Sequence, residues 1–167
     1  DLAQALETTP ICARLLISRG LSDPCVARSY INKIDSKLYD PYPLKDMDKA
    51  AARIKKAMDD GEKITIYGDY DVDGVTAVTT MYTYLSDRNV SVDYYIPERE
   101  NEGYGLNCGA IDAIAQSGTT LIVTVDTGIT AIEDVEHANE LGIDIVITDH
   151  HRCRETLPDA VAVVDPH

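Results

Sequence analysis

Tryptophan and phenylalanine are absent from this chain of 167 residues, so tyrosine, present in ten copies, is its only aromatic residue. Most of these tyrosines are expected to be half-buried core residues. The sequence also contains no apolar stretch as long as a membrane span, and no basic-then-apolar signal peptide at its N-terminus. These absences predict a cytoplasmic protein with no membrane partner.

Cysteine is scarce and scattered. None of the four cysteines forms a C-x-x-C pair, which predicts buried, reduced thiols rather than disulfides or zinc ligands. His150 and Cys153 have an H-x-x-C spacing, but a zinc site would need a second pair nearby. The sequence also lacks the serine or cysteine arrangements that are typical of nucleophilic catalysis.

Basic residues are few in most of the chain, whose net charge is −14. Residues 1–60 contain ten basic and nine acidic side chains, whereas residues 61–167 contain five basic and twenty acidic ones, a balance of −15. Phosphate contacts need lysine and arginine, so this balance argues against a broad DNA-binding footprint on residues 61–167. A basic groove would have to lie elsewhere.

Three apolar runs each end in an acidic cluster, and the last cluster carries two histidines. The runs are KITIYG before DYDVDG (63–74), LIVTV before DTG (121–128) and DIVIT before DHH (144–151). Each run is short and β-branched, and a segment with helical spacing follows it. This pattern is typical of buried parallel strands in an α/β sheet.

The order of elements predicts an α/β fold: a mainly parallel sheet flanked by helices, after a small helical N-terminal lead. We expect the lead at residues 1–45 and the main domain at residues 46–167. Thr9 and Asp23 each precede a proline and predict two helix starts, and Asp46 is expected to cap a third helix. The domain is expected to have strands at 64–68, 91–96, 121–126, 144–149 and 160–165, helices at 75–88, 108–117 and 130–141, helix ends at Gly118 and Gly142, and a capping box of Thr130 with Glu133.

The residues that follow these strands are expected to meet, because groups just past the carboxyl ends of neighbouring parallel strands share one crevice. Carboxylates packed so closely repel one another unless cations lie between them. The sequence therefore predicts a metal site, whose candidate residues are Asp69, Asp71, Asp73, Asp126, Asp149, His150 and His151.

The first acidic cluster also fits other interpretations. Residues 71–75, DVDGV, match the D-x-D-G-[TV] opening of haloacid-dehalogenase-like phosphatases, in which the first aspartate is a nucleophile. Such an enzyme also needs a later lysine and a further acidic pair at a strand end, and neither follows Lys63. An aspartate and a glycine after a strand can also simply make a turn that caps the next helix. That explanation suits one cluster but not three on neighbouring strands.

Taken in order, the motifs resemble the DHH phosphoesterase superfamily and, within it, the RecJ family of single-strand-specific exonucleases. The resemblance runs through SRGL at 18–21, DPYPLKDMDKA at 40–50, IYGDYDVDGVT at 66–76, YYIPERENEGYGL at 94–106, LIVTVDTGI at 121–129, IVITDHH at 145–151 and LPDAVAVVDPH at 157–167. DHH alone is a weak signal, whereas the ordered set is highly specific.

This resemblance implies a two-metal phosphodiesterase. Asp71 and Asp73 would hold one metal each, and Asp126 would bridge both. His150 would share the metal of Asp73, and Asp69 is a weaker candidate for a further ligand. Carboxylates with one imidazole suit Mn²⁺ or Mg²⁺ better than zinc or copper.

The resemblance also assigns residues around the metals. Asp149 is expected either to orient His150 from behind or to cap the following turn. His151 would face the scissile phosphate and neutralise charge or donate a proton, unless it is an exposed loop histidine. Arg99 is the best candidate for a phosphate contact, although it can also pair with a neighbouring glutamate. Residues 103–105 (Gly103, Tyr104 and Gly105) would form a flexible loop in which Tyr104 stacks on a base or sugar.

The implied activity is removal of nucleotides from the 5′ end of single-stranded DNA during repair and recombination, with repair and recombination proteins as possible partners. RecJ-like proteins carry a fourth motif, an aspartate beyond DHH, and then a C-terminal domain. The resemblance places Asp165 at an Asp-Pro turn instead, so the chain is expected to be an N-terminal fragment that is inactive alone.

Two alternatives stay open. The first is another DHH hydrolase, acting on short oligonucleotides, cyclic dinucleotides or pyrophosphate. The RecJ-like lead at residues 1–60 argues against it. The second is a catalytically silent scaffold, which the intact Asp71, Asp73, Asp126 and His150 argue against.

Overall fold

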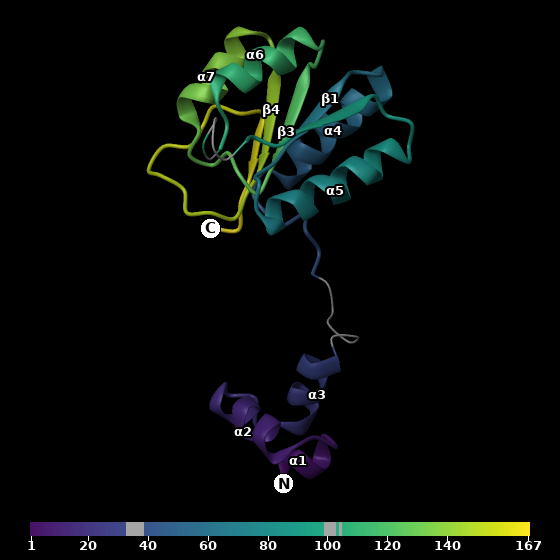
Figure 1. Cartoon of the computed structure of the whole chain (residues 1–167), viewed down its shortest axis with the longest axis vertical. Coiled ribbons are helices and arrows are strands. Elements are labelled where there is room, and N and C mark those ends of the chain that lie inside the picture. The colour runs from purple at the N-terminus through teal and green to yellow at the C-terminus, as the bar shows by residue number, and fades with distance from the viewer. Residues whose placement is uncertain (33–38, 99–102, 104) are drawn as a thin grey trace. The chain divides into compact units, whose positions relative to one another are not determined.

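The structure, a computed structural model, describes residues 1–32, 39–98, 103 and 105–167 (Figure 1). The chain forms two compact units, Asp1–Asp40 and Pro41–His167. The unit boundary lies five residues before the end expected for the helical lead. Arg99 and Tyr104 lie outside the described residues.

The first unit is helical, with α1 at Leu2–Ala5, α2 at Pro10–Ser18 and α3 at Pro24–Asn32. The two predicted helix starts are confirmed. The hydroxyl of Thr9 accepts from the amide of Cys12, and the carboxylate of Asp23 accepts from the amides of Cys25 and Val26. The four residues of α1 were not predicted, because so short a helix shows no hydrophobic periodicity. The small core of this unit consists of Leu2, Ala3, Ala13, Leu16 and Ala27.

The second unit contains a five-stranded sheet with the order β2-β1-β3-β4-β5, in which every pairing is parallel. The strands are β1 Ile64–Tyr67, β2 Val92–Tyr95, β3 Leu121–Val125, β4 Asp144–Thr148 and β5 Ala162–Val164. The central strands β1 and β3 are buried at every position, as their unbroken apolar sequences predict. The predicted α/β class and parallel sheet are therefore confirmed.

Helices cover both faces of the sheet (Figure 1). These helices are α4 Met47–Asp60, α5 Val72–Ser86, α6 Cys108–Gln116 and α7 Ile132–Glu140. One core lies between the sheet and α4 with α5, and the other lies between the sheet and α6 with α7. Among the described helices, none is long and apolar enough to span a membrane.

The starts of α5 and α7 differ from the prediction, whereas α4 and α6 begin where expected, at Met47 and Cys108. Asp71 caps α5, which begins at Val72 rather than at residue 75, so the first acidic cluster lies partly on the helix. The predicted capping box at Thr130 does not form, because α7 begins at Ile132 after Ala131. Asp46 is the N-cap residue of α4, as predicted, but it adopts a left-handed conformation and its side chain pairs with Lys49 and makes no capping hydrogen bond. Local side-chain signals mark the region of a helix start but not its residue.

Two burial predictions were also wrong. All four cysteines are exposed, at Cys12, Cys25, Cys108 and Cys153. Among the nine described tyrosines, five are exposed, namely Tyr30, Tyr39, Tyr42, Tyr84 and Tyr94, while Tyr67 is fully buried. Aliphatic residues from the strands and the helices supply most of the core, and these cysteine and tyrosine side chains lie at the surface.

The strand β2 forms one edge of the sheet, and its outer side is partly covered. The carbonyls of Ser91 and Tyr95 accept from β1, so the backbone amide of Tyr94 points the other way. The carboxylate of Asp93 accepts from that amide at 2.8 Å.

The strand order places the functional end of the sheet. Chain connections run outward in opposite directions from β1 and β3, so a crevice opens past the carboxyl ends of these two neighbouring strands. In the register, Tyr67 of β1 lies beside Thr124 of β3, and Val125 of β3 lies beside Thr148 of β4. The acidic clusters that follow these strands therefore lie at the same end of the sheet.

The opposite end of the sheet, where the strands begin, carries a network of ion pairs. The guanidinium of Arg53 contacts Glu62 at 2.7 Å and Asp144 at 2.6 Å, and the hydroxyl of Thr120 donates to Glu62 at 2.7 Å. The hydrogen bonds from Arg53 and Thr120 lower the pKa of Glu62 from 4.5 to about 2. This network ties α4 to the starts of β3 and β4.

We expect this network to make the chain sensitive to acid. Glu62 stays charged in the folded chain down to about pH 2, whereas its unfolded carboxyl takes up a proton near pH 4.5. Its contribution to the unfolding free energy is therefore complete above that upper value and is lost as the pH falls through this window. When the unfolding free energy is measured with urea between about pH 2 and pH 4.5, Glu62→Gln should make it depend less on pH. Glu136 is exposed, so the matched change Glu136→Gln should leave the pH dependence as in the parent chain. If both variants changed the pH dependence equally, this role of Glu62 would be contradicted.

Candidate metal centre

Asp126 occupies a strained turn directly after β3. Its φ is 60°, in the left-handed region that non-glycine residues rarely adopt. Its backbone amide donates to the carbonyl of Thr148 at 3.0 Å, which holds the turn against β4. A residue in this conformation costs about 1–3 kcal/mol and persists only where its surroundings enforce it, often at functional sites. Aspartate tolerates the conformation better than most residues.

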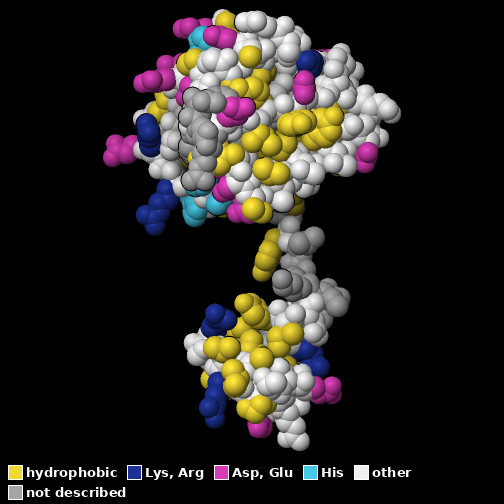
Figure 2. Space-filling view, in the orientation of Figure 1, with side chains coloured by type: hydrophobic (Ala, Val, Ile, Leu, Met, Phe, Trp, Pro, Cys, Tyr) yellow, Lys and Arg dark blue, Asp and Glu magenta, His cyan; other side chains and the backbone are white. Residues whose placement is uncertain are grey.

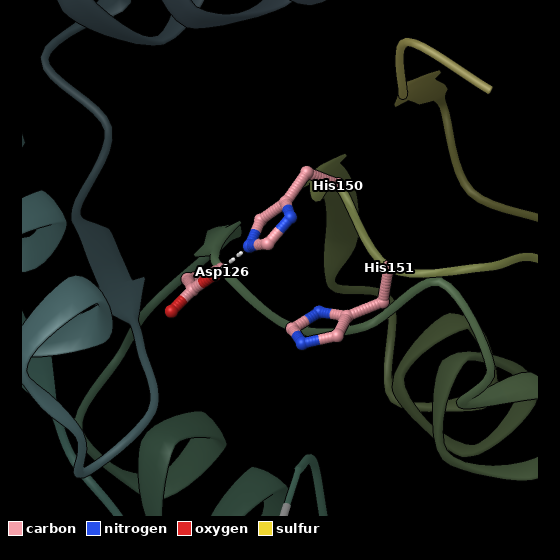
Figure 3. Close-up of side chains that lie close together, drawn as sticks. All are labelled: Asp126, His150 and His151. Atoms are coloured by element: carbon pink, nitrogen blue, oxygen red, sulfur yellow. Dashed lines mark hydrogen bonds and ion pairs between the residues drawn. The ribbon is translucent and has the colours of Figure 1, made fainter. Parts of the chain in front are cut away.

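The two histidines of DHH follow β4 and lie beside Asp126 (Figure 3). The Nε2 atom of His150 lies 2.8 Å from Oδ1 of Asp126. The rings of His150 and His151 stack with their centroids 4.6 Å apart. One ligand atom from each of Asp126, His150 and His151 lies within 4.8 Å of the others, and no other such trio occurs among the described residues. The predicted convergence of the second and third clusters is therefore present.

Asp149 is buried behind the histidines. Its Oδ1 accepts from the backbone amides of His150 and His151, and it also lies 2.7 Å from Nδ1 of His151. Its Oδ2 accepts from the amide of Ile129 at 3.0 Å. Asp149 thus caps the turn, as one of the two expectations held, and the ring it orients belongs to His151. The other expectation, that Asp149 orients His150 from behind, stays a prediction: Asp149 accepts from the backbone amide of His150, but its ring contact is with His151.

The electrostatics of the three carboxylate and imidazole groups follow from burial and partners. Burial raises the pKa of Asp126, and the nearby charge of Asp71 acts in the same direction, which together outweigh the hydrogen bond with His150. Burial alone would raise the pKa of Asp149, but its hydrogen bonds from Ile129 and His151 lower it overall. The hydrogen bond with Asp149 raises the pKa of His151, which favours the imidazolium.

The first acidic cluster lies at the same edge but is less tightly gathered. Asp71 accepts from the amide of Gly74 at 2.9 Å and so caps α5, as the simple turn interpretation expected. Its charge nevertheless reaches Asp126, and Asp73 borders the same groove as Asp126 and His150. Asp71, Asp73 and Asp69 stand outside the trio of close ligand atoms.

Asp69 has an unusual environment. The residue is 3% exposed, and its buried Oδ1 has no hydrogen-bond partner among the described residues. A buried carboxylate oxygen without a partner is costly unless a cation compensates it. Its charge is close enough to raise the pKa of His151. This buried oxygen without a partner is the strongest indication that the carboxyl end of the sheet binds a cation.

An open groove borders the centre. It has a volume of about 800 Å³, and Asp73, Asp126 and His150 contribute to one part of its wall. The rest of the wall is mostly apolar and includes Leu44 and Met81. The centre is therefore accessible to a ligand larger than an ion.

The loop predicted beside the site is only partly described. The hydroxyl of Tyr67 donates to the carbonyl of Gly105 at 2.9 Å, and the amide group of Asn107 donates to Tyr67 at 3.3 Å. Gly103 and Gly105 both have positive φ, at 82° and 88°. The buried Tyr67 therefore ties this segment to the end of β1, close to the centre, a role that its position inside an apolar strand did not reveal.

The donor set fits a hard divalent cation. To the close trio of Asp126, His150 and His151, the candidate ligands Asp69, Asp71 and Asp73 would add three carboxylates, which would make the set rich in oxygen. Mn²⁺ and Mg²⁺ prefer such oxygen-rich sets, whereas zinc sites favour cysteine and histidine. Cys153 does not join the close trio, so the H-x-x-C spacing forms no thiolate site here.

Comparison with known families identifies the domain. The family model described as "DHH family, N-terminal domain" matches residues 63–167, which contain every element from β1 onward and all of the centre. The chain belongs to the DHH family.

Two relatives with similar sequences are both named RecJ. The chain is 47% identical over 166 residues to the single-stranded-DNA-specific exonuclease RecJ of Bacillus subtilis, covering 99% of this chain and 21% of that protein. It is 36% identical over 165 residues to RecJ of Escherichia coli, covering 96% of this chain and 27% of that protein. The chain thus spans about a quarter of these relatives.

Solved structures of DHH proteins agree. The crystal structure of an exonuclease RecJ bound to manganese superposes with a TM-score of 0.71 at 32% identity, covering 77% of this chain and 33% of that one. RecJ of Thermus thermophilus in complex with Mn²⁺ gives a TM-score of 0.72 at 28% identity, covering 99% of this chain and 22% of that one. These structures share the parallel sheet that positions the DHH residues.

Proposed function

We propose that this chain is the metal-binding part of a phosphodiesterase that degrades single-stranded DNA from its 5′ end during DNA repair and recombination. The observation that carries the proposal is the convergence of Asp126, His150 and His151 beside a buried, unpartnered oxygen of Asp69. The relatives named as single-stranded-DNA-specific exonucleases match nearly the whole chain and support this substrate.

Two divalent ions, Mn²⁺ or Mg²⁺, are the proposed cofactors. Asp71 and Asp73 would hold one ion each, Asp126 would bridge both, and His150 would join the ion of Asp73, with Asp69 as a further donor. Such a pair of ions activates water and stabilises the leaving oxygen of a phosphodiester. The raised pKa of Asp126 and its closeness to Asp71 fit this role, because bound cations would relieve their repulsion.

His151 is the proposed catalytic residue on the substrate side. Asp149 accepts from its backbone amide and contacts its ring, so the imidazole is fixed in direction. The same contact favours the charged ring, which can neutralise negative charge on the phosphate or donate a proton to the leaving oxygen. Arg99 as a phosphate contact and Tyr104 as a stacking residue belong to the same proposal.

The surface charge of the chain limits how it can bind DNA. On the face of the second unit shown in Figure 2, acidic side chains outnumber basic ones. The balance of −15 over residues 61–167 means that this region supplies few phosphate contacts. We therefore infer that other parts of the longer protein supply most of the affinity for the strand.

The activity test compares substrates on the full-length protein with Mn²⁺. Long single strands labelled at the 5′ or 3′ end, matching duplexes, dinucleotides and pyrophosphate should be offered in parallel. We expect loss of nucleotides from the 5′ end of the single strand alone. Preference for dinucleotides or pyrophosphate would favour the other DHH hydrolases, and no hydrolysis at all would favour a scaffold. Residues 1–167 alone are expected to be inactive.

His151→Ala should lower the turnover of the full-length protein by about 10²–10⁴-fold, the usual contribution of a proton-transferring side chain. Its Mn²⁺ affinity should change little, because a group that acts only in the transition state is not part of the metal shell. Calorimetric titration with Mn²⁺ and single-turnover kinetics measure the two effects. His137, which pairs with Asp112 between α6 and α7, offers the control His137→Ala, which should change neither. Loss of Mn²⁺ binding in His151→Ala would make this histidine a ligand.

A further inference from the structure

We propose that Thr124 is a positioning residue for the metal centre, which holds the turn of Asp126 in its strained conformation. This inference rests on the proposed function, because it takes Asp126 as the bridging ligand. Thr124 lies on β3 and is fully buried, and its hydroxyl bonds to Thr127 rather than to a candidate ligand.

The hydroxyl of Thr124 acts on the turn directly. It donates to the carbonyl of Thr127 at 2.8 Å, so it spans from the strand to the residue just after Asp126. Thr124 itself is held from behind, since the hydroxyl of Thr148 on β4 donates to its carbonyl at 2.7 Å. A chain of two hydrogen bonds therefore links β4 to Thr124 on β3, and Thr124 to Thr127 in the turn.

The second half of the turn is fixed by Asp149. Its carboxylate accepts from the amide of Ile129, three residues past Asp126, while its other oxygen contacts His151. The turn is thus held at two residues after Asp126: Thr127 bonds to a hydroxyl on β3, and Ile129 bonds to a carboxylate that also contacts the DHH histidines. A shift of the turn would separate Asp126 from His150, with which it makes a 2.8 Å contact.

Space around the turn shows that Thr124 and the turn fit closely. Gly128 has a φ of 112°, and a Cβ added there would lie 2.8 Å from the hydroxyl oxygen of Thr124. The turn therefore approaches Thr124 as closely as it does only because residue 128 is glycine. If the Thr124 hydroxyl needed only some hydrogen-bond partner in the core, the turn would not have to approach it this closely.

The chain contains a matched control for Thr124. Thr65 on β1 is also buried and shares a 2.7 Å hydrogen bond with Thr119, but at the opposite end of the sheet. Thr65→Val and Thr124→Val each remove one buried hydroxyl bond while keeping the side-chain shape. A general loss of stability should therefore be similar in both, whereas loss of the metal geometry should occur only in Thr124→Val.

The first measurement is Mn²⁺ affinity of the full-length protein, followed by the electron paramagnetic resonance signal of free Mn²⁺. Thr124→Val should weaken binding about 10–100-fold, as removal of groups that orient metal ligands usually does. Thr124→Ser, which keeps the hydroxyl, should restore most of the affinity, and Thr65→Val should bind as the parent does. Unchanged affinity in Thr124→Val, or equal losses in both valine variants, would overturn the proposal.

The second measurement needs no metal and separates this proposal from the proposed function. In nuclear magnetic resonance spectra of residues 1–167, Thr124→Val should move the Cα and Cβ shifts of Asp126 away from left-handed values and speed exchange of the Ile129 amide. Thr65→Val should leave both as in the parent. Unchanged shifts and exchange in Thr124→Val would overturn the role of Thr124, whatever the protein binds. A parent protein that fails to bind Mn²⁺ would count against the metal assignment alone.

Discussion

Asp126→Ala is expected to abolish Mn²⁺ binding and exonuclease activity of the full-length protein together. Asp126 is the residue around which the centre is arranged, since it contacts His150 and its charge interacts with Asp71. In the proposed centre, its removal would take away a ligand shared by both cations and a charge that offsets them. Calorimetric titration with Mn²⁺ and a nuclease assay on a 5′-labelled single strand measure the two losses. Retention of more than a few per cent of the activity would refute the bridging role.

Asp126→Gly separates the ligand from the backbone conformation. Glycine adopts a φ of 60° without strain, whereas alanine must bear it. Both variants should therefore be inactive, but Asp126→Gly should unfold at a higher temperature than Asp126→Ala, by the equivalent of about 1 kcal/mol. If the glycine variant kept Mn²⁺ binding, the turn rather than the carboxylate would be the important feature.

Gly74→Ala is expected to destabilise the domain by about 3 kcal/mol or more, because there is no room for a Cβ. The added atom would lie 2.4 Å from the carbonyl oxygen of Asp69 and 2.7 Å from its backbone nitrogen. The clash involves backbone on both sides, so it cannot be relieved by rotating a side chain. It would push α5 away from Asp69 and disturb the cap made by Asp71. Urea unfolding gives the stability, and Mn²⁺ titration under native conditions shows whether the centre is displaced.

Gly109→Ala is the control for this change. Gly109 lies in α6, and a Cβ there would meet its nearest neighbour, Oδ1 of Asn107, at an ordinary 3.5 Å. Its stability should be unchanged or slightly raised, since alanine favours a helix more than glycine does. Equal destabilisation by the two substitutions would show that the close approach at Gly74 is not important.

The position of the centre could be predicted from the sequence because it depends on two simple features, the apolar runs that form the strands and the parallel direction of those strands. Unbroken apolar runs such as 121–125 predict buried parallel strands, and parallel strands bring their carboxyl ends to one edge. Asp126 and His150 therefore meet although 24 residues separate them. The glycines at 118 and 142 mark helix ends for an equally local reason, since both have positive φ.

Other features could not be predicted because they depend on contacts between segments. The partner of Asp149 is the ring of His151 rather than that of His150, which follows from the direction of the chain after β4. The left-handed conformation of Asp126 and the bond from Thr124 to Thr127 require the packed turn. The buried oxygen of Asp69 appears only once α5 lies against its backbone, at Gly74.

The edge strand β2 has a consequence for self-association. Exposed strand edges are templates onto which another chain can add, and this is a common route to aggregation. Here the outward amide of Tyr94 is already bonded to the carboxylate of Asp93, whose other oxygen lies 3.8 Å from the ammonium of Lys63. An incoming strand would have to break the bond to Tyr94. We therefore expect β2 to be a poorer template for an added strand than an edge with all of its outward amides free would be.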